Sequence, residues 1–126
     1  MKKIITTDKA PAPIGPYNQA VLLGDLLYTS GQIAIDPKTG VLEIDDIESE
    51  TTLVMENIKA ILEAAEMTFE NVVKSSIFVS DMHNFSKINE IYGRYFNTET
   101  APARETVEVA NLPKFVNVEI SVIAAR

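Results

Sequence analysis

Hydrophobic and polar positions change their spacing along the chain, and each spacing is typical of one kind of element. In the last segment, Val116–Ala125, apolar and polar residues alternate, as they do in a strand with one buried face. Short runs of apolar and β-branched residues predict further strands. These strands are expected around Ile4–Thr6 and at Asn18–Leu23, Leu26–Gly31, Asn71–Val79 and Arg104–Val109.

Two segments have the three- and four-residue spacing of a helix with one buried face. The first begins near Ile47 and extends to Ala65, after acidic residues that suit a helix N-terminus. The second covers Phe85 to Phe96, and Pro102 stands beyond its end. The sequence therefore predicts two helices among the strands.

The connections also carry local signals. Three of the six prolines fall in residues 9–16, which predicts a stiff, extended loop because proline fixes φ and removes a donor. Gly24 and Asp25 separate two apolar runs and predict a tight hairpin. A turn is expected over Asp36–Gly40.

The predicted element order is β-ββ-α-β-α-ββ, an α+β arrangement. Two helices can cover only one face of such a sheet. The other face would carry Val107, Val109, Glu119 and Ile123, which is too apolar a set to leave in water. We therefore expect other subunits to cover that face, with catalytic groups possible at the interface.

Size and composition narrow the class of protein. A chain of 126 residues is expected to form one domain spanning residues 1–126. It has no cysteine and one histidine, which excludes disulfides and thiolate metal sites and makes a zinc centre or a Ser-His-Asp triad hard to assemble. The net charge of −7 argues against nucleic-acid binding. Without a signal peptide or an apolar span, a soluble cytoplasmic protein is expected.

Arg104 and Glu119 are the informative candidates for chemistry, because each is a charged residue on a predicted strand. A guanidinium matches a carboxylate bidentately, so Arg104 suits a small acidic substrate. Glu119 could orient water or transfer a proton. From spacing alone, a structural ion pair or two exposed edge charges explains them better than a catalytic role does.

Other candidates are weaker when taken alone. Tyr17 follows the proline-rich loop, and Ser30 and Gly31 end a hairpin strand where a backbone can approach a ligand. Asn89 interrupts the apolar stripe of the second helix. A core tyrosine, a strand-end turn and a surface amide are the structural interpretations. His83 could act as a base, but a solvent-facing position at a helix start suits it better.

Acidic residues gather around the start of the first helix and resemble a metal cluster only superficially. A solvated helix N-terminus explains them better. The residues concerned are Glu43, Asp45, Asp46, Glu48 and Glu50. No glycine-rich phosphate loop or dinucleotide fingerprint is present, so neither a metal nor a cofactor is predicted.

Several strings in order resemble the RidA/YjgF family, also called the endoribonuclease L-PSP family. The resemblance covers essentially the whole chain, and Asn89, Tyr92 and Phe96 fit the second-helix pattern of the family. The strings are Ala12–Ala20, Tyr28–Gln32, Thr100–Val109, Leu112–Lys114 and Val118–Ile120.

The resemblance implies a chorismate-mutase-like fold that forms a homotrimer, with the sheets packed into a central barrel and three sites between subunits. It also implies hydrolytic deamination of reactive 2-imino and 2-enamino acids. Examples are 2-iminopropanoate, 2-aminoacrylate and 2-iminobutanoate, which arise when pyridoxal-phosphate enzymes eliminate water from serine or threonine. The products are 2-oxo acids and ammonia, and no cofactor is implied.

The family pattern also implies roles for particular residues. Arg104 matches the arginine that binds the substrate carboxylate, and Glu119 matches the glutamate that positions water or assists proton transfer. The matched substrate-binding positions are Tyr17, Ser30, Gly31, Asn89 and Thr106. Thr106 is often cysteine in the family, where its backbone groups contact substrate. Glu105 stands where Ser or Thr is commoner, so an added acid beside the arginine could alter specificity.

Three alternatives stay open from the sequence. A trimer that binds 2-oxo acids and regulates another process would use the same arginine without turnover. Endoribonuclease activity or translation inhibition is associated with some family members, but the acidic charge counts against it. A purely structural or chaperone-like trimer has no positive feature in the sequence.

Overall fold

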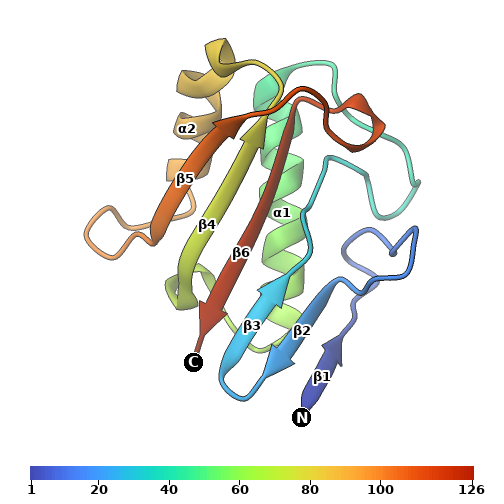
Figure 1. The fold of residues 1–126 in the computed structure, drawn as a ribbon, viewed down its shortest axis with the longest axis vertical. Coiled ribbons are helices and arrows are strands. Elements are labelled where there is room, and N and C mark those ends of the chain that lie inside the picture. The colour runs from blue at the N-terminus through green and yellow to red at the C-terminus, as the bar shows by residue number, and fades with distance from the viewer.

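Six strands form one mixed sheet in the computed structural model, which describes residues 1–126 (Figure 1). Across the sheet the strands lie in the order β1-β2-β3-β6-β4-β5. Only β4 and β5 run parallel, and the other neighbours are antiparallel. The strands are β1 (Lys2–Ile5), β2 (Ala20–Leu23), β3 (Leu26–Thr29), β4 (Val72–Val79), β5 (Ala103–Glu108) and β6 (Val118–Ala125).

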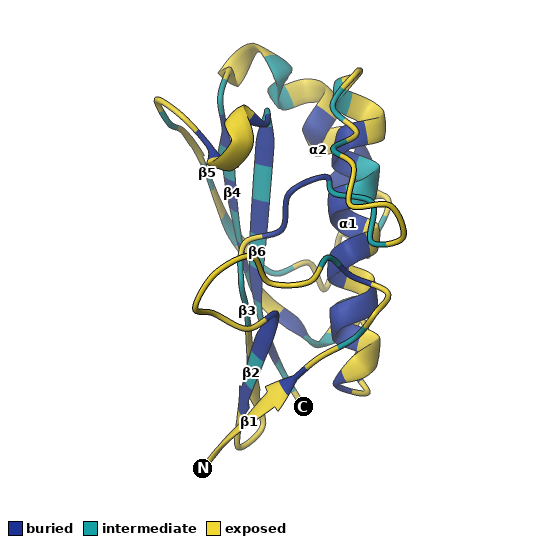
Figure 2. Ribbon diagram, turned by 90° about the vertical axis from the view of Figure 1, so that its right-hand side faces the viewer, coloured by how far each residue is buried: buried dark blue, intermediate teal, exposed yellow.

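Two helices, α1 (Ile47–Ala64) and α2 (Phe85–Gly93), lie on the same face of this sheet, as Figure 2 shows. The order of helices and strands along the chain is the one predicted from the sequence. Helix α1 begins where Asp46 accepts a hydrogen bond from the Ser49 amide at 2.8 Å, because a short side-chain acceptor satisfies a free N–H at a helix start. The chain has no helix with the length and apolar character that crossing a membrane requires.

Most element ends agree with the predictions within two residues, but the second helix was predicted too long. It ends at Gly93, so Tyr95 and Phe96 lie beyond it in turns with three-residue hydrogen bonds. Both rings pack against Phe69, with centroids 5.1 and 5.2 Å apart. The spacing of these aromatic residues therefore reflects a shared, partly buried aromatic cluster rather than a continuing helix.

The main core lies between the helices and the sheet. Leu27, Ile77 and Ile120 from the sheet meet Val54 and Ile58 of α1 there, all almost completely buried. Packing of one apolar face of each layer against the other supplies the main driving force for this fold.

The opposite face of the sheet is open and partly apolar, as predicted. Val107 is 41% exposed, Ile123 and Glu119 are partly exposed, and Val109 contacts a small second cluster. Further apolar residues exposed on this face are Ile4, Leu23, Leu26 and Tyr28. The expectation that other subunits cover this face stays a prediction.

Candidate active site in two halves

The strand register places the two charged candidates on opposite faces of the sheet. Arg104 pairs with Ser75 of β4, and Glu119 pairs with Phe78 of the same strand. Residues 75 and 78 are three apart, and successive side chains in a strand point to opposite faces. Ser75 accepts a hydrogen bond from the Tyr92 hydroxyl of α2 at 2.9 Å, which identifies its face as the helix-covered one. Arg104 therefore lies on the helix side, and Glu119 on the open side.

Helix α2 holds the Arg104 side chain in place. Its guanidinium donates a hydrogen bond from Nη1 to Asn89 Oδ1 at 2.7 Å. The Cζ atom lies 5.0 Å from the ring centroid of Tyr92 and 5.6 Å from that of Phe85, within cation–π distance of both rings. No acidic side chain pairs with Arg104. The guanidinium is thus oriented by neutral groups and keeps donors free for an external carboxylate.

Thr106 follows Arg104 on the same face, because it pairs with Ile77 of β4. Its hydroxyl is buried and has no hydrogen-bond partner in the chain. Both residues stand on β5, which is the edge strand of the sheet. The outward backbone groups of this strand therefore have no strand neighbour within the chain.

The open-face half is a cleft of about 390 Å³. Tyr17, Ser30, Gly31 and Glu119 line it together, so four of the predicted residues meet here. None of Arg104, Asn89 and Thr106 reaches this cleft. The structure therefore brings the seven predicted residues together as two separate groups, one on each face.

Within the cleft, Glu119 lies directly on Gly31. A Cβ atom added to Gly31 would stand 2.7 Å from Cδ of Glu119, far closer than such atoms can approach. The Glu119 carboxyl has no hydrogen bond or ion pair within the chain, and partial burial raises its pKa above the ordinary value. This cleft thus presents a carboxyl group that no other side chain compensates.

Gln19 holds the proline-rich loop against the cleft, and the sequence interpretation assigned it no role. It is buried, and its Nε2 donates to the carbonyls of Thr7, Ala10 and Pro11 at 2.8–3.1 Å. Tyr17, directly after this loop, lines the cleft. A glutamine placed between a proline-rich loop and an apolar strand was the available signal, since buried amides need nearby backbone partners.

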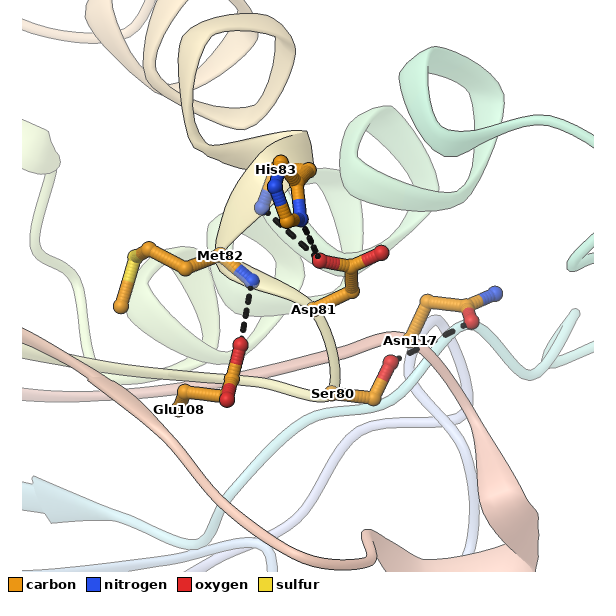
Figure 3. Close-up of polar contacts among 6 residues, drawn as sticks. All are labelled: Ser80, Asp81, Met82, His83, Glu108 and Asn117. Atoms are coloured by element: carbon orange, nitrogen blue, oxygen red, sulfur yellow. Dashed lines mark hydrogen bonds and ion pairs between the residues drawn. The ribbon is translucent and has the colours of Figure 1, made fainter.

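His83 is solvent-facing, as its structural interpretation held (Figure 3). Its side chain is 96% exposed and contacts Asp81 Oδ1 at 2.7 Å. That hydrogen bond raises the pKa of His83. The Asp81 carboxylate also accepts from the His83 amide, which caps a short turn before α2. These contacts give His83 a local structural role away from the cleft.

The acidic residues around the start of α1 form no metal cluster, because no three His, Asp or Glu side chains in the chain come together. Four of them are exposed, as a solvated helix start predicts: Glu43, Asp45, Asp46 and Glu48. The interpretation was wrong for Glu50, which is completely buried. Its carboxyl turns inward and accepts hydrogen bonds at the start of β6.

Glu105 is adjacent to Arg104 in sequence but points to the other face of the sheet. Its carboxylate pairs with Lys74 at 2.8 Å and accepts a hydrogen bond from Ser76. The hydrogen bond from Lys74 lowers the pKa of Glu105. Within one chain, this added acid is therefore not a neighbour of the Arg104 guanidinium.

Comparison with known proteins identifies the family. The family model described as endoribonuclease L-PSP matches residues 7–126. A RutC family protein of Saccharolobus solfataricus is 52% identical over 100% of this chain and 99% of its own length. The 2-iminobutanoate/2-iminopropanoate deaminase of Salmonella typhimurium is 47% identical, covering 100% of this chain and 99% of its own. The chain therefore belongs to the RidA/YjgF family.

A solved structure agrees with this assignment. The crystal structure of Escherichia coli TdcF with bound serine matches with a TM-score of 0.92 and 44% identity, covering 98% of each chain. The six-stranded sheet with two helices is thus the fold of the family.

Proposed function

We propose that this protein hydrolyses reactive 2-imino acids and their enamine tautomers to 2-oxo acids and ammonia. Relatives with 47% and 44% identity are named 2-iminobutanoate/2-iminopropanoate deaminase and putative reactive intermediate deaminase. The observation that carries the proposal for this chain is Arg104, an oriented guanidinium without an acidic partner. A substrate carboxylate would supply the negative charge that Arg104 lacks as a partner within the chain.

The proposed active site is assembled from two copies of the chain. Arg104, Asn89 and Thr106 lie on the helix side of the edge strand, while Glu119 lies in the open-face cleft with Tyr17. Side chains on opposite faces of one sheet cannot close on a small molecule. Contact between the edge strand of one copy and the open face of the next would join the halves. The exposed apolar residues of that face support such contact, and the homotrimer that the family resemblance implies would satisfy it with three equivalent sites.

The proposed reaction is the addition of water to a C=N bond. The water oxygen bonds to C2 of the imino acid and the water gives up one proton, while the C=N electron pair moves to nitrogen and the nitrogen takes up a proton. In the resulting carbinolamine the amino nitrogen takes up a second proton, the C–N bond breaks to release ammonia, and the hydroxyl loses its proton as C=O forms, leaving the 2-oxo acid. Arg104 would hold the carboxylate so that C2 faces the water.

Glu119 is the group placed to handle protons in this step. Burial raises its pKa, so the carboxyl keeps its proton to a higher pH than an exposed glutamate does. In its protonated form it could donate to the departing nitrogen, and in its ionised form it could orient or deprotonate the attacking water. The imine is itself an electrophile, so this chemistry calls on water and side chains alone.

A 2-oxo acid-binding trimer without turnover is the alternative that uses the same Arg104. The structure offers no observation that favours nuclease activity, and the net charge of −7 opposes binding to phosphates. Turnover is therefore the property that separates the proposal from its rival.

The test is an imine-hydrolysis assay. An amino-acid oxidase generates 2-iminopropanoate, and its loss is followed with wild-type protein and with Arg104→Ala. We expect wild-type protein to accelerate the loss and Arg104→Ala to be at least about 100-fold less active, since a charge-assisted bidentate contact is removed. Circular dichroism and thermal melting should show that the variant remains folded. No acceleration by folded wild-type protein would favour the binding trimer, and full activity of folded Arg104→Ala would contradict the assigned role.

A further inference from the structure

Glu50 is a buried carboxyl group that the proposed chemistry does not use. It lies in the first turn of α1, is completely buried, and has no cationic partner among the ion pairs of the chain. Burying such a group costs free energy unless hydrogen bonds replace the lost water. Its three contacts all come from two consecutive residues, Asn117 and Val118.

Those contacts fix the backbone at the start of β6. Glu50 Oε2 accepts from the Asn117 amide at 2.8 Å and from the Val118 amide at 3.3 Å, and Oε1 accepts from Asn117 Nδ2 at 2.7 Å. On the other side of the strand, the Asn117 carbonyl accepts from the Ser80 amide at 3.1 Å. Asn117 is therefore held from both sides, and its side chain also meets the Ser80 hydroxyl (Figure 3).

Glu50 takes the place that a neighbouring strand would occupy. Further along β6, Ile120 exchanges backbone hydrogen bonds with Gln32, at 2.8 and 3.1 Å. Val118 lies two residues earlier, so its amide points toward the same edge of β6. At that position the Glu50 carboxyl accepts the hydrogen bond instead of a strand carbonyl.

Glu119 stands between these two anchored residues. Val118 before it is held by Glu50, and Ile120 after it is held by Gln32. We infer that Glu50 is a positioning residue: by fixing the backbone at Asn117 and Val118, it holds the Glu119 carboxyl at the place in the cleft where the reaction occurs. This inference rests on the proposed function, because it deepens the role of the same site.

The test compares two replacements of Glu50 with one matched control. Glu50→Met keeps the length of the side chain but has no acceptor. Glu50→Gln keeps one oxygen that can accept from the backbone amides of Asn117 and Val118. The side-chain amide of Asn117 can flip, so that its oxygen accepts from the new NH₂ group. Glu48→Met removes an exposed acid from the same helix turn, so it controls for the loss of charge near the helix N-terminus.

We expect Glu50→Met to lower kcat about 10-fold with KM within about twofold, because Arg104 still binds the carboxylate. Glu50→Gln should recover most of that loss, and Glu48→Met should match wild type. In a Glu119→Gln background, adding Glu50→Met should lower kcat no further, since the two residues act through one carboxyl. An equal further loss in that background, or no loss from Glu50→Met alone, would overturn the inference.

A second measurement is independent of turnover. Two quantities are measured in wild type, Glu50→Gln and Glu50→Asp: hydrogen exchange of the Val118 amide and the ¹³C NMR titration of the Glu119 carboxyl. Glu50→Asp keeps an acid but shortens it, so it replaces Glu50→Met should that variant fail to fold. We expect Glu50→Asp to speed exchange and shift the Glu119 titration, and Glu50→Gln to change both less. An unchanged Glu119 titration in Glu50→Asp overturns the inference. Absence of imine hydrolysis in wild type overturns the proposed function instead, and the NMR comparison still decides the position of Glu119.

Discussion

The Arg104 guanidinium is held by Asn89, Tyr92 and Phe85 within its own chain, whereas the Glu119 carboxyl, on the other face of the sheet, makes no hydrogen bond or ion pair. The helix-covered face has a packed layer that can orient a guanidinium through neutral groups. The open face has only the cleft, where burial raises the pKa of Glu119 without any compensating charge. Arg104 therefore has no negatively charged partner within the chain, and Glu119 has no positively charged one. In the proposed site, the substrate and the second copy of the chain would supply these charges.

The largest expected effect is the rescue of two inactive variants by mixing. Arg104→Ala keeps an intact Glu119, and Glu119→Gln keeps an intact Arg104. If each site takes one half from each of two copies, unfolding and refolding the two variants together at equal amounts restores about a quarter of the sites. The measurement is imine hydrolysis by the refolded mixture, with each variant refolded alone as control. A mixture no more active than its parts would show that the halves do not meet between copies.

Glu119→Gln should lower kcat about 100-fold, as removal of a group that transfers protons does. It should also raise stability at neutral pH. The raised pKa means that Glu119 favours folding below the unfolded pKa, and that this contribution is lost as pH rises through the folded pKa. Because the side chain is half-exposed, solvent screening limits the difference to about 0.5 kcal/mol.

Urea unfolding at pH 4 and pH 7 measures this difference. Most of the stability difference should disappear at the lower pH, where Glu119 is mostly protonated in both the folded and the unfolded chain. The variant should be the more stable at pH 7. A stability difference of the same size at both pH values would show that ionisation of Glu119 is not its cause.

Gly31→Ala probes the contact on which the Glu119 carboxyl rests. The added methyl group would stand 2.7 Å from Cδ of Glu119, so the flexible carboxyl must move while the backbone stays in place. We expect kcat to fall about 10-fold, because small displacements of a catalytic group carry large costs. Gly93→Ala is the matched control, since its added Cβ meets no atom within 4 Å and should preserve activity while stabilising α2 by about 0.5–1 kcal/mol. Equal activity of the two variants would remove Gly31 from the site.

The smallest effect concerns Thr106, whose buried hydroxyl has no partner. Thr106→Val keeps the shape and the backbone groups but removes the unsatisfied oxygen. The free energy of unfolding should stay the same or rise by up to about 1 kcal/mol. Thr51→Val is the control, because the buried Thr51 hydroxyl donates to the Ile47 carbonyl at 2.7 Å and its loss should destabilise by about 1 kcal/mol. Destabilisation of both variants, measured by urea unfolding, would indicate that the Thr106 hydroxyl has a partner in solution.

The spacing of apolar residues along the chain was enough to predict the order of the strands and helices. It also predicted that one face of the sheet is not covered by helices. Alternation in β6 places Glu119 opposite the buried Val118 and Ile120, so its face followed from the sequence. The sequence did not show on which face Arg104 lies, because β5 is an edge strand whose residues are all partly or fully exposed. When neither set of alternate residues in a strand is clearly apolar, the sequence does not show which set faces the core.

Only the tertiary structure decided which residues meet. In the sequence, the acids around the start of α1 all resemble a solvated helix start. In the structure Glu50 turns inward, because the first turn of α1 lies beside the backbone amides at the start of β6. Gly31 and the Glu119 side chain are in close contact although they lie 88 positions apart in the sequence. The pairing of their neighbours Gln32 and Ile120 brings them together. Local pattern determines which element forms and which of its faces is apolar. Contacts between distant segments depend on the register and packing of the whole sheet, which no local pattern contains.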